Sequence, residues 1–211
     1  MPQRRIYDIS EPISEGTSTW PGDSSFSREW VMRLDQGQTC NVSTIRMSTH
    51  CGTHVDSAYH FLEAGSTTDR TSLIPYLGRC LVLDVEGKGE PLVVPPESLE
   101  ALPPVERILL RTREEHDHEN FDGGFCSLGP QAAKTCVDLG LKLVGLDTPS
   151  MDTCESKELP SHHILLHGGV ALLENLDLTG VPEGFYELIA LPLKIVGSDA
   201  SPVRAILRAL D

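Results

Sequence analysis

The chain has 211 residues, a formal net charge of −14 and a composition of 39% apolar and 23% charged residues. These values are typical of a globular protein with a buried core rather than of a disordered chain. The acidic balance disfavours nucleic acid and anionic membranes as partners, because phosphate groups would be repelled. Because no apolar run of about 18 residues is present and the start MPQRRIYDISEP lacks the apolar part of a secretory signal, we expect a cytoplasmic protein without a membrane span.

Apolar, β-branched segments bounded by glycine and proline predict most of the regular structure. Each has the length and residue types of a strand. The predicted strands cover residues 40–47, 80–85, 107–111, 141–146 and 188–196. The chain is therefore expected to be rich in strands.

One longer segment, GPQAAKTCVDL, predicts a helix that starts near residue 129. Ser127 is a candidate N-cap, Pro130 suits the first turn and Gly140 suits the position after the end. A second, shorter helix is expected at residues 96–101, and the polar residues 113–124 predict a surface loop. With no long linker, we expect one α/β domain over residues 1–211, with few short helices.

The stretch STHCGTHVDSAYHF, residues 48–61, contains three of the eight histidines and an aspartate. A helix would place His50 and His54 on one face but Asp56 on the far side. On an extended chain, where side chains alternate, His50, His54, Asp56 and His60 all have the same parity. We therefore expect an extended segment, bent at Gly52, whose polar side chains converge on one pocket.

Converging imidazole and carboxylate groups are typical metal ligands. Each histidine alone could instead satisfy backbone groups or lie on the surface, but four polar groups of one parity favour a metal site. The neighbouring Cys51 could be a soft ligand, although alternation would turn it away. No CxxC pair is present, and the six cysteines are expected to be reduced thiols.

A second cluster, LPSHHILLHGGVALLEN, could complete the site. It offers His162, His163, His167 and Glu174, and the sequence alone does not choose among them. A carboxylate shared between the two clusters could bridge two ions about 3.5–4 Å apart. Asp147 and Asp152, around Thr148-Pro149-Ser150, are interpreted as residues that hold turns.

These motifs resemble the cyclase-like metal-dependent hydrolases, and among them the bacterial kynurenine formamidases. The residues from His50 to Phe61 follow the family pattern HxGxHxDxPxHF. YDISEPISEGTSTWPGD, GLDTPSMD, SHHILLHGGVALLENL and GVPEGFYELIALPLKIVGSDASPVRAIL resemble further family segments in the same order. Ala58 stands where the family usually has proline and Ser57 where it often has alanine, which puts the substrate range in question.

The resemblance implies a swivelling β/β/α fold, a homodimer or higher even oligomer, and two Zn²⁺ ions per subunit, with Mn²⁺ as an alternative. It implies that His50, His54 and Asp56 hold the first metal. Asp56 and Glu174 would bridge both ions, and His162 would bind the second.

The resemblance also implies an arylformamidase that hydrolyses N-formyl-L-kynurenine to formate and L-kynurenine. His60 would be the catalytic acid and base, and Trp20, in TWPGD, would contact the aromatic ring of the substrate. An ordinary packing role for Trp20 stays open.

Three alternatives stay open beside this interpretation. One is a related amide, lactam or ester hydrolase, such as an isatin hydrolase, which the altered Ser57-Ala58 pair allows. Another is a metal-binding module without turnover. The last is catalysis by a Cys51 thiolate, which would need a base beside an exposed thiol.

Overall fold

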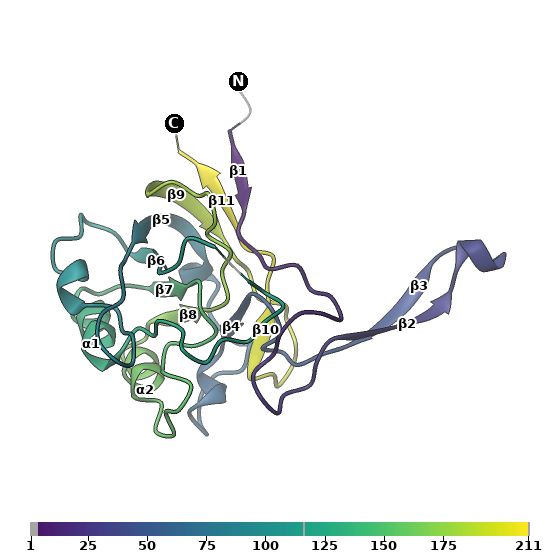
Figure 1. The fold of residues 1–211 in the computed structure, drawn as a ribbon, viewed down its shortest axis with the longest axis horizontal. Helices are drawn as coiled ribbons and strands as arrows, with labels where there is room; N and C mark the ends of the chain where they lie inside the picture. Colours follow the sequence, from purple (N-terminus) through teal and green to yellow (C-terminus); the bar gives the residue numbers. More distant parts are fainter. Residues whose placement is uncertain (1–3, 116, 211) are drawn as a thin grey trace.

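A seven-stranded sheet organises the chain, and the computed structural model describes residues 4–115 and 117–210 (Figure 1). The sheet has the order β1-β11-β9-β5-β6-β7-β8. Its strands are β1 (Ile6–Asp8), β5 (Leu77–Asp84), β6 (Arg107–Arg111), β7 (Leu143–Leu146), β8 (Ala171–Leu173), β9 (Gly184–Ile189) and β11 (Ile206–Ala209). Strands β5 to β8 run parallel, whereas β1, β11 and β9 are joined to one another and to β5 in antiparallel register.

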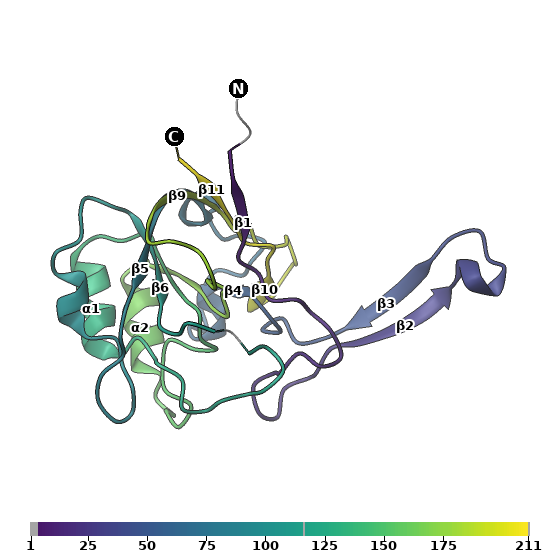
Figure 2. The same cartoon turned by 45° about the horizontal axis from the view of Figure 1, so that its top comes forward.

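Two α-helices, α1 (Pro130–Asp138) and α2 (Pro160–His167), lie together on one face of the sheet (Figure 2). The parallel strands need crossover connections, and these helices lie in two of them. Alternate side chains of β5 and β6 point to opposite faces. Leu81 and Ile108 pack in the core beneath the helices, whereas Val82 and Leu109 pack in a second core on the other face.

A short antiparallel pair, β4 (His54–Asp56) and β10 (Ala200–Pro202), lies on the side of the second core. Ala200 is paired with Asp56 and Pro202 with His54. Val55 points into the second core, so His54 and Asp56 point the opposite way. The pairing thus fixes the direction of two polar side chains.

The hairpin of β2 (Ser27–Met32) and β3 (Val42–Arg46) projects from the body as an arm, with the 3₁₀ turn Leu34–Gln36 near its tip (Figures 1 and 2). All of β3 and all but the last residue of β2 are exposed. The arm was not predicted beyond the strand expected at residues 40–47, because burial does not set the alternation of its residues.

The expected fold class is confirmed: the protein is a strand-rich α/β protein with two short α-helices. The strand expected at residues 107–111 is present with the same bounds. Those expected at residues 40–47 and 141–146 are shorter, and the one expected at residues 80–85 begins earlier, at Leu77, and ends at Asp84. The prediction at residues 188–196 is wrong after Ile189, where β9 ends, because Pro192 interrupts the run and cannot donate to a ladder.

The predicted helix is confirmed as α1, but its N-cap is not Ser127. Gly129 occupies that position with φ of +75°, which favours glycine, and Pro130 follows at the first helical residue. The segment expected as a helix at residues 96–101 is a single 3₁₀ turn, Pro96–Leu99. Among the described residues, every helix is too short or too polar to cross a membrane.

Candidate metal-dependent active site

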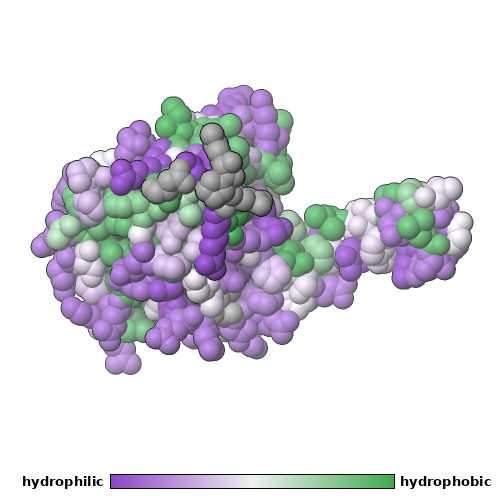
Figure 3. Space-filling model, turned by 90° about the horizontal axis from the view of Figure 1, so that it is seen from above, coloured by the Kyte–Doolittle hydropathy of each residue, from purple (hydrophilic) through white to green (hydrophobic). Residues whose placement is uncertain are grey.

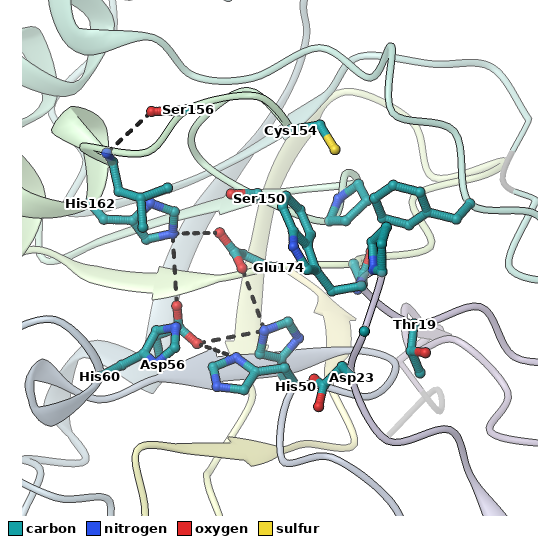
Figure 4. Close-up of a pocket in the computed structure, with 18 of the residues that line it drawn as sticks. Thr19, Asp23, His50, Asp56, His60, Ser150, Cys154, Ser156, His162 and Glu174 are labelled. Carbon is teal, nitrogen blue, oxygen red and sulfur yellow. Dashed lines mark hydrogen bonds and ion pairs between the residues drawn. The ribbon is translucent and has the colours of Figure 1, made fainter.

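A cavity of about 480 Å³ lies beside β4 and the N-terminus of α2 (Figure 4). Its inner lining includes four of the predicted residues from the opening motif, His50, His54, Asp56 and His60, and two from the second cluster, His162 and Glu174. Trp20 lines it as well, so the structure brings all seven predicted site residues to one cavity.

The opening motif converges on the cavity, but not as one extended segment. Only His54 to Asp56 form a strand, whereas His50 lies in the preceding turn and His60 in the 3₁₀ turn Ala58–His60. Gly52 bends the chain with φ of +69°, and a β-carbon there would lie 3.0 Å from Ile13. The shared parity therefore predicted the grouping correctly, although turns on either side of β4 produce it.

Asp56 lies at the centre of the polar cluster and is almost fully buried. One carboxylate oxygen, Oδ1, is 3.1 Å from Nδ1 of His50 and 3.5 Å from Nε2 of His54. The other, Oδ2, is 3.8 Å from Nε2 of His162. One oxygen of the carboxylate thus faces the rings of His50 and His54, and the other faces the ring of His162.

Glu174 faces Asp56 from the end of β8. Its Oε2 atom is 3.4 Å from Nε2 of His54, and its Oε1 atom is 3.2 Å from Nε2 of His162. The backbone N–H of Met151 also donates to Oε1 at 2.8 Å. Glu174 therefore lies between His54 and His162, as Asp56 does.

Two backbone hydrogen bonds join the clusters. The N–H of His54 donates to the carbonyl of Glu174 at 3.2 Å, and the N–H of Glu174 donates to the carbonyl of His54 at 3.0 Å. Side chains more than a hundred positions apart in sequence are thereby held in a fixed relation by the main chain.

His162 is the third residue of α2, and its ring is held by the carboxylate of Asp152. The carboxylate accepts from Nδ1 of His162 at 2.7 Å and from the backbone N–H groups of Ser161 and His162. With Nδ1 occupied in this way, Nε2 is directed toward Asp56 and Glu174. Asp152 was interpreted as a turn residue, but it also orients a site histidine.

The electrostatics of the metal-free cluster favour protons on His50 and His162. Burial lowers the pKa of His162, but hydrogen bonds to Asp152 and Glu174 outweigh it and raise the pKa to about 10. Burial likewise opposes the charge on His50, yet the Asp56 and Asp199 carboxylates raise its pKa to about 9. Burial raises the pKa of Asp56 and Glu174, but the surrounding imidazoles lower both below their ordinary values.

His60 stands at the open side of the cluster. Its side chain is 34% exposed, and its ring centroid lies 4.2 Å from that of His50. Desolvation lowers its pKa, so the imidazole is neutral at pH 7. This combination of access and neutrality differs from the protonated state of His50 and His162.

Aromatic rings form the outer wall of the cavity. Trp20 packs edge-on against Phe121 with 5.4 Å between ring centroids, and Phe61 lies 4.4 Å from the ring of His162. The cavity therefore joins a polar floor to walls that can contact a flat apolar ligand.

The donor set fits divalent metal ions. Three groups of possible ligand atoms lie within 4.8 Å of one another among the described residues: His50 with His54 and Asp56, Asp56 with His162 and Glu174, and His50 with His60 and Asp199. Oδ1 of Asp56 is buried and has no hydrogen-bond partner among the described residues, although two imidazoles lie beside it. A buried carboxylate oxygen in that position fits a ligand waiting for a cation.

Other residues considered from the sequence lie outside the site. His163 and His167 do not line the cavity, and Nδ1 of His167 donates to the carbonyl of His163. Cys51 is fully buried outside the cavity lining, and burial raises the pKa of its thiol to about 11. A Cys51 thiolate nucleophile is therefore disfavoured.

Asp199 is a site residue that sequence reasoning missed. Its Oδ2 atom accepts from Nε2 of His50 at 2.9 Å and lies 3.6 Å from Nδ1 of His60. Its segment, GSDASP, was noted only as part of the family resemblance. A carboxylate far from the histidines in sequence gave no spacing that could assign it.

Imidazole and carboxylate ligands gathered at one side of this α/β sheet define the class of metal-dependent hydrolases. Residues 7–153 match the model of the Cyclase family, described as "Putative cyclase", and this range covers more than half of the chain. The chain therefore belongs to the Cyclase family. The match includes the opening motif from His50 to His60, while His162, Glu174 and Asp199 follow it.

Solved structures agree with this assignment along nearly the whole chain. A "potential metal-dependent hydrolase with cyclase activity" is 28% identical, with a TM-score of 0.83 and coverage of 98% of both chains. A "predicted metal-dependent hydrolase" from Bacillus stearothermophilus is 27% identical, with a TM-score of 0.82 and coverage of 97% of this chain and 98% of that one. Isatin hydrolase A from Labrenzia aggregata, in complex with benzyl benzoate, shares the fold at 20% identity, a TM-score of 0.78 and coverage of 98% and 94%.

Proposed function

We propose that the protein is a zinc-dependent amidohydrolase that removes the formyl group from N-formyl-L-kynurenine. The observation that carries the proposal is the shared carboxylate Asp56, which has one oxygen beside His50 and His54 and the other beside His162. An aromatic-walled cavity opens directly onto these imidazoles. A cavity with imidazole and carboxylate groups at its floor and aromatic side chains in its wall suits the hydrolysis of an aryl amide.

In this proposal, His50, His54 and Asp56 hold one ion, and Asp56, His162 and Glu174 hold the other. When bound, the ions would act as Lewis acids and lower the pKa of a water to about 7. Zinc is favoured because imidazoles dominate the ligands, and manganese stays the alternative because two carboxylates are among them.

His60 is the proposed acid and base. A neutral imidazole beside the cluster can accept a proton from the attacking water and then donate it to the nitrogen of the leaving amine. Its partial exposure leaves room for a substrate between the ring and solvent. The other imidazoles are turned toward carboxylates and are less free for this role.

Trp20 and Phe121 are the proposed contacts for the aromatic ring of the substrate. The cavity volume of about 480 Å³ falls in the range of about 300–1,000 Å³ typical of small-molecule sites. With the ring against Trp20, the amide of an ortho-substituted aniline can extend toward Asp56 and Glu174. The ordinary packing role of Trp20 is partly met too, since its ring contacts Phe121 and Phe125.

A lactam such as isatin is the second candidate substrate. Three structures with this fold are isatin hydrolases, one of them bound to the product analogue thioisatinate, at 16–20% identity. Ser57 follows Asp56, and Ala58, at the position where the family pattern usually has proline, begins the 3₁₀ turn that carries His60. A changed backbone there can alter which amide reaches His60.

A substrate panel with zinc counted on the same sample tests the proposal. N-formylkynurenine, formanilide, isatin and an aryl ester are compared by kcat/KM, with His167→Gln as a histidine variant away from the cavity. Highest turnover of N-formylkynurenine supports the proposal, and highest turnover of isatin supports the second candidate. A zinc-loaded protein that leaves all four compounds intact would favour a metal-binding module without turnover.

The proposed enzyme acts as a homodimer or higher even oligomer. Trp30, Val31 and Ile45 on the β2-β3 arm are exposed by 41%, 62% and 55%, and Figure 3 shows apolar patches along the arm among more hydrophilic residues. A two-stranded hairpin alone is marginally stable in water. We therefore assign a second copy of this chain as the partner that covers the arm.

A further inference from the structure

Asp199 contacts two imidazoles that have different proposed roles. Oδ2 of Asp199 accepts from Nε2 of His50 at 2.9 Å and lies 3.6 Å from Nδ1 of His60. The His50 and His60 rings are neighbours, with 4.2 Å between their centroids. Thr49 donates its hydroxyl to the other oxygen, Oδ1, at 3.3 Å.

The backbone holds Asp199 in this place. Asp199 directly precedes β10, whose Ala200 is paired with Asp56 on β4. The N–H and the hydroxyl of Ser57 both donate to the carbonyl of Asp199 at 2.8 Å. Ser57 is 2% exposed and stands where the family pattern often has alanine, so its hydroxyl is an anchor that such relatives would lack.

The contact fixes which nitrogen of His50 is available to a metal. A carboxylate only accepts, so Nε2 of His50 carries the hydrogen in this bond. Nδ1 then faces Oδ1 of Asp56 and can offer its lone pair once its proton is displaced. Oδ2 of Asp199 also lies 3.6 Å from Nδ1 of His60, which is within ion-pair distance of that ring.

We propose that Asp199 is a positioning residue that orients both the metal ligand His50 and the acid/base His60, and that Ser57 braces it. This inference deepens the proposed function by adding the group that couples the metal site to the proton-transfer residue. Asp199 itself is not proposed to bind a metal or to touch the reacting atoms.

The first test measures zinc binding, with no substrate present. Metal-free wild type, Asp199→Ala and Asp199→Asn are titrated with Zn²⁺ in competition with a chromophoric chelator. We expect affinity to fall about 10- to 100-fold in Asp199→Ala, the usual effect of removing a carboxylate that orients a metal-bound histidine. Wild-type affinity in Asp199→Ala would overturn the proposal.

Asp69→Asn is the matched control. Asp69 accepts from the backbone N–H of Gly197 at 3.0 Å and so supports the loop that carries Asp199, but it pairs with no imidazole in the part of the chain that the structure describes. If the loop acts only through its stability, Asp69→Asn should weaken zinc binding as much as Asp199→Ala, and the proposal is then wrong. Ser57→Ala should give a smaller loss than Asp199→Ala, because the side-chain carboxylate remains.

The second test follows the His50 ring directly. In long-range ¹H–¹⁵N spectra of metal-free protein, we expect a hydrogen-bonded Nε2–H of His50 that is retained in Asp69→Asn and lost in Asp199→Ala. An unchanged resonance in Asp199→Ala would contradict the assigned contact. Neither test measures turnover. If the protein hydrolysed none of the substrates, the proposed function would be wrong, but zinc affinity and the His50 resonance would still test the role of Asp199.

Discussion

Nδ1 of His162 donates to the carboxylate of Asp152 at 2.7 Å, and both side chains are buried. Asp152 also accepts hydrogen bonds from two backbone N–H groups in the first turn of α2. One carboxylate therefore satisfies free N–H groups of the helix and directs His162 toward Asp56. His54, Asp56 and His162 are consequently held on a strand and a helix terminus, whereas His50 and His60 lie in turns beside the strand. Substitutions within it should separate clearly into those that alter metal binding and those that alter turnover.

Substitution of His60 should remove turnover and spare the metal. His60→Gln keeps a polar side chain of similar reach but cannot exchange a proton near neutral pH. We expect kcat on the best substrate to fall about 100- to 10,000-fold, the usual contribution of a general acid or base. Elemental analysis should give wild-type zinc content, and a wild-type kcat would contradict the assigned role.

Substitution of the shared carboxylate should have the opposite effect. Asp56→Asn removes one negative charge from between the two groups of imidazoles, so metal content should fall at both positions. Metal per chain after dialysis against a weak chelator measures this loss. His163→Gln, which changes a histidine outside the cavity lining, is the control and should keep its metal.

The metal-free protein should lose stability as pH rises. In the folded state the pKa of His162 is raised from 6.5 to about 10, and that of His50 to about 9. A raised pKa stabilises the fold fully below the unfolded value of about 6.5 and progressively less up to about pH 9–10. Urea midpoints of metal-free protein should therefore fall across that interval.

The corresponding variant tests the source of this pH dependence. In His162→Gln the fall in urea midpoint with pH should be shallower, since one of the two imidazoles with a raised pKa is gone. Zinc binding should strengthen with pH over the same interval, because the ligand imidazoles must first lose protons. A stability difference between wild type and His162→Gln that stays constant with pH would refute the explanation.

Polar substitutions on the arm should dissociate the proposed dimer. Trp30 lies on β2 and Ile45 on β3, and both are exposed. Trp30→Ser with Ile45→Ser should reduce the mass measured by light scattering to that of one chain while far-UV circular dichroism is retained. A wild-type chain that is monomeric at micromolar concentration would already exclude the assigned partner.

Removal of the Cys51 thiol should leave the chemistry intact. The thiol is buried, its pKa is raised to about 11, and it does not line the cavity. Cys51→Ala should keep the wild-type kcat/KM and zinc content, with a loss of stability on the order of 1 kcal/mol from the smaller side chain. A large fall in kcat at full zinc content would instead revive a nucleophilic cysteine.

The parts of this protein that sequence predicted are those governed by local periodicity. The strands at residues 107–111 and 143–146 have patterns set by burial on both faces, and the helix at residues 130–138 has a pattern set by burial of one face. Helix α2 was not predicted, because PSHHILLH has little amphipathic pattern and was considered only for its histidines. The arm and the paired strands β4 and β10 depend on partners far along the chain.

The site residues show the same difference between local patterns, which sequence predicts, and contacts between distant parts of the chain. Parity grouped His50, His54, Asp56 and His60, which are within eleven residues of one another, and the structure brings them to one cavity. His162 and Glu174 could be chosen from the second cluster only through the family resemblance. Asp152 and Asp199 reach their histidines through tertiary packing, and no spacing rule covers such contacts.

The paired main chains of His54 and Glu174 have a consequence for the order of assembly in the cell. During synthesis, the HxxxHxD motif leaves the ribosome more than a hundred residues before Glu174, so the early chain holds only three of the five proposed metal ligands. Zinc capture should therefore follow completion of the central sheet, and a truncated chain that ends before β8 should bind zinc only weakly. Metal supply would then act as a final, post-translational checkpoint rather than as a template for folding.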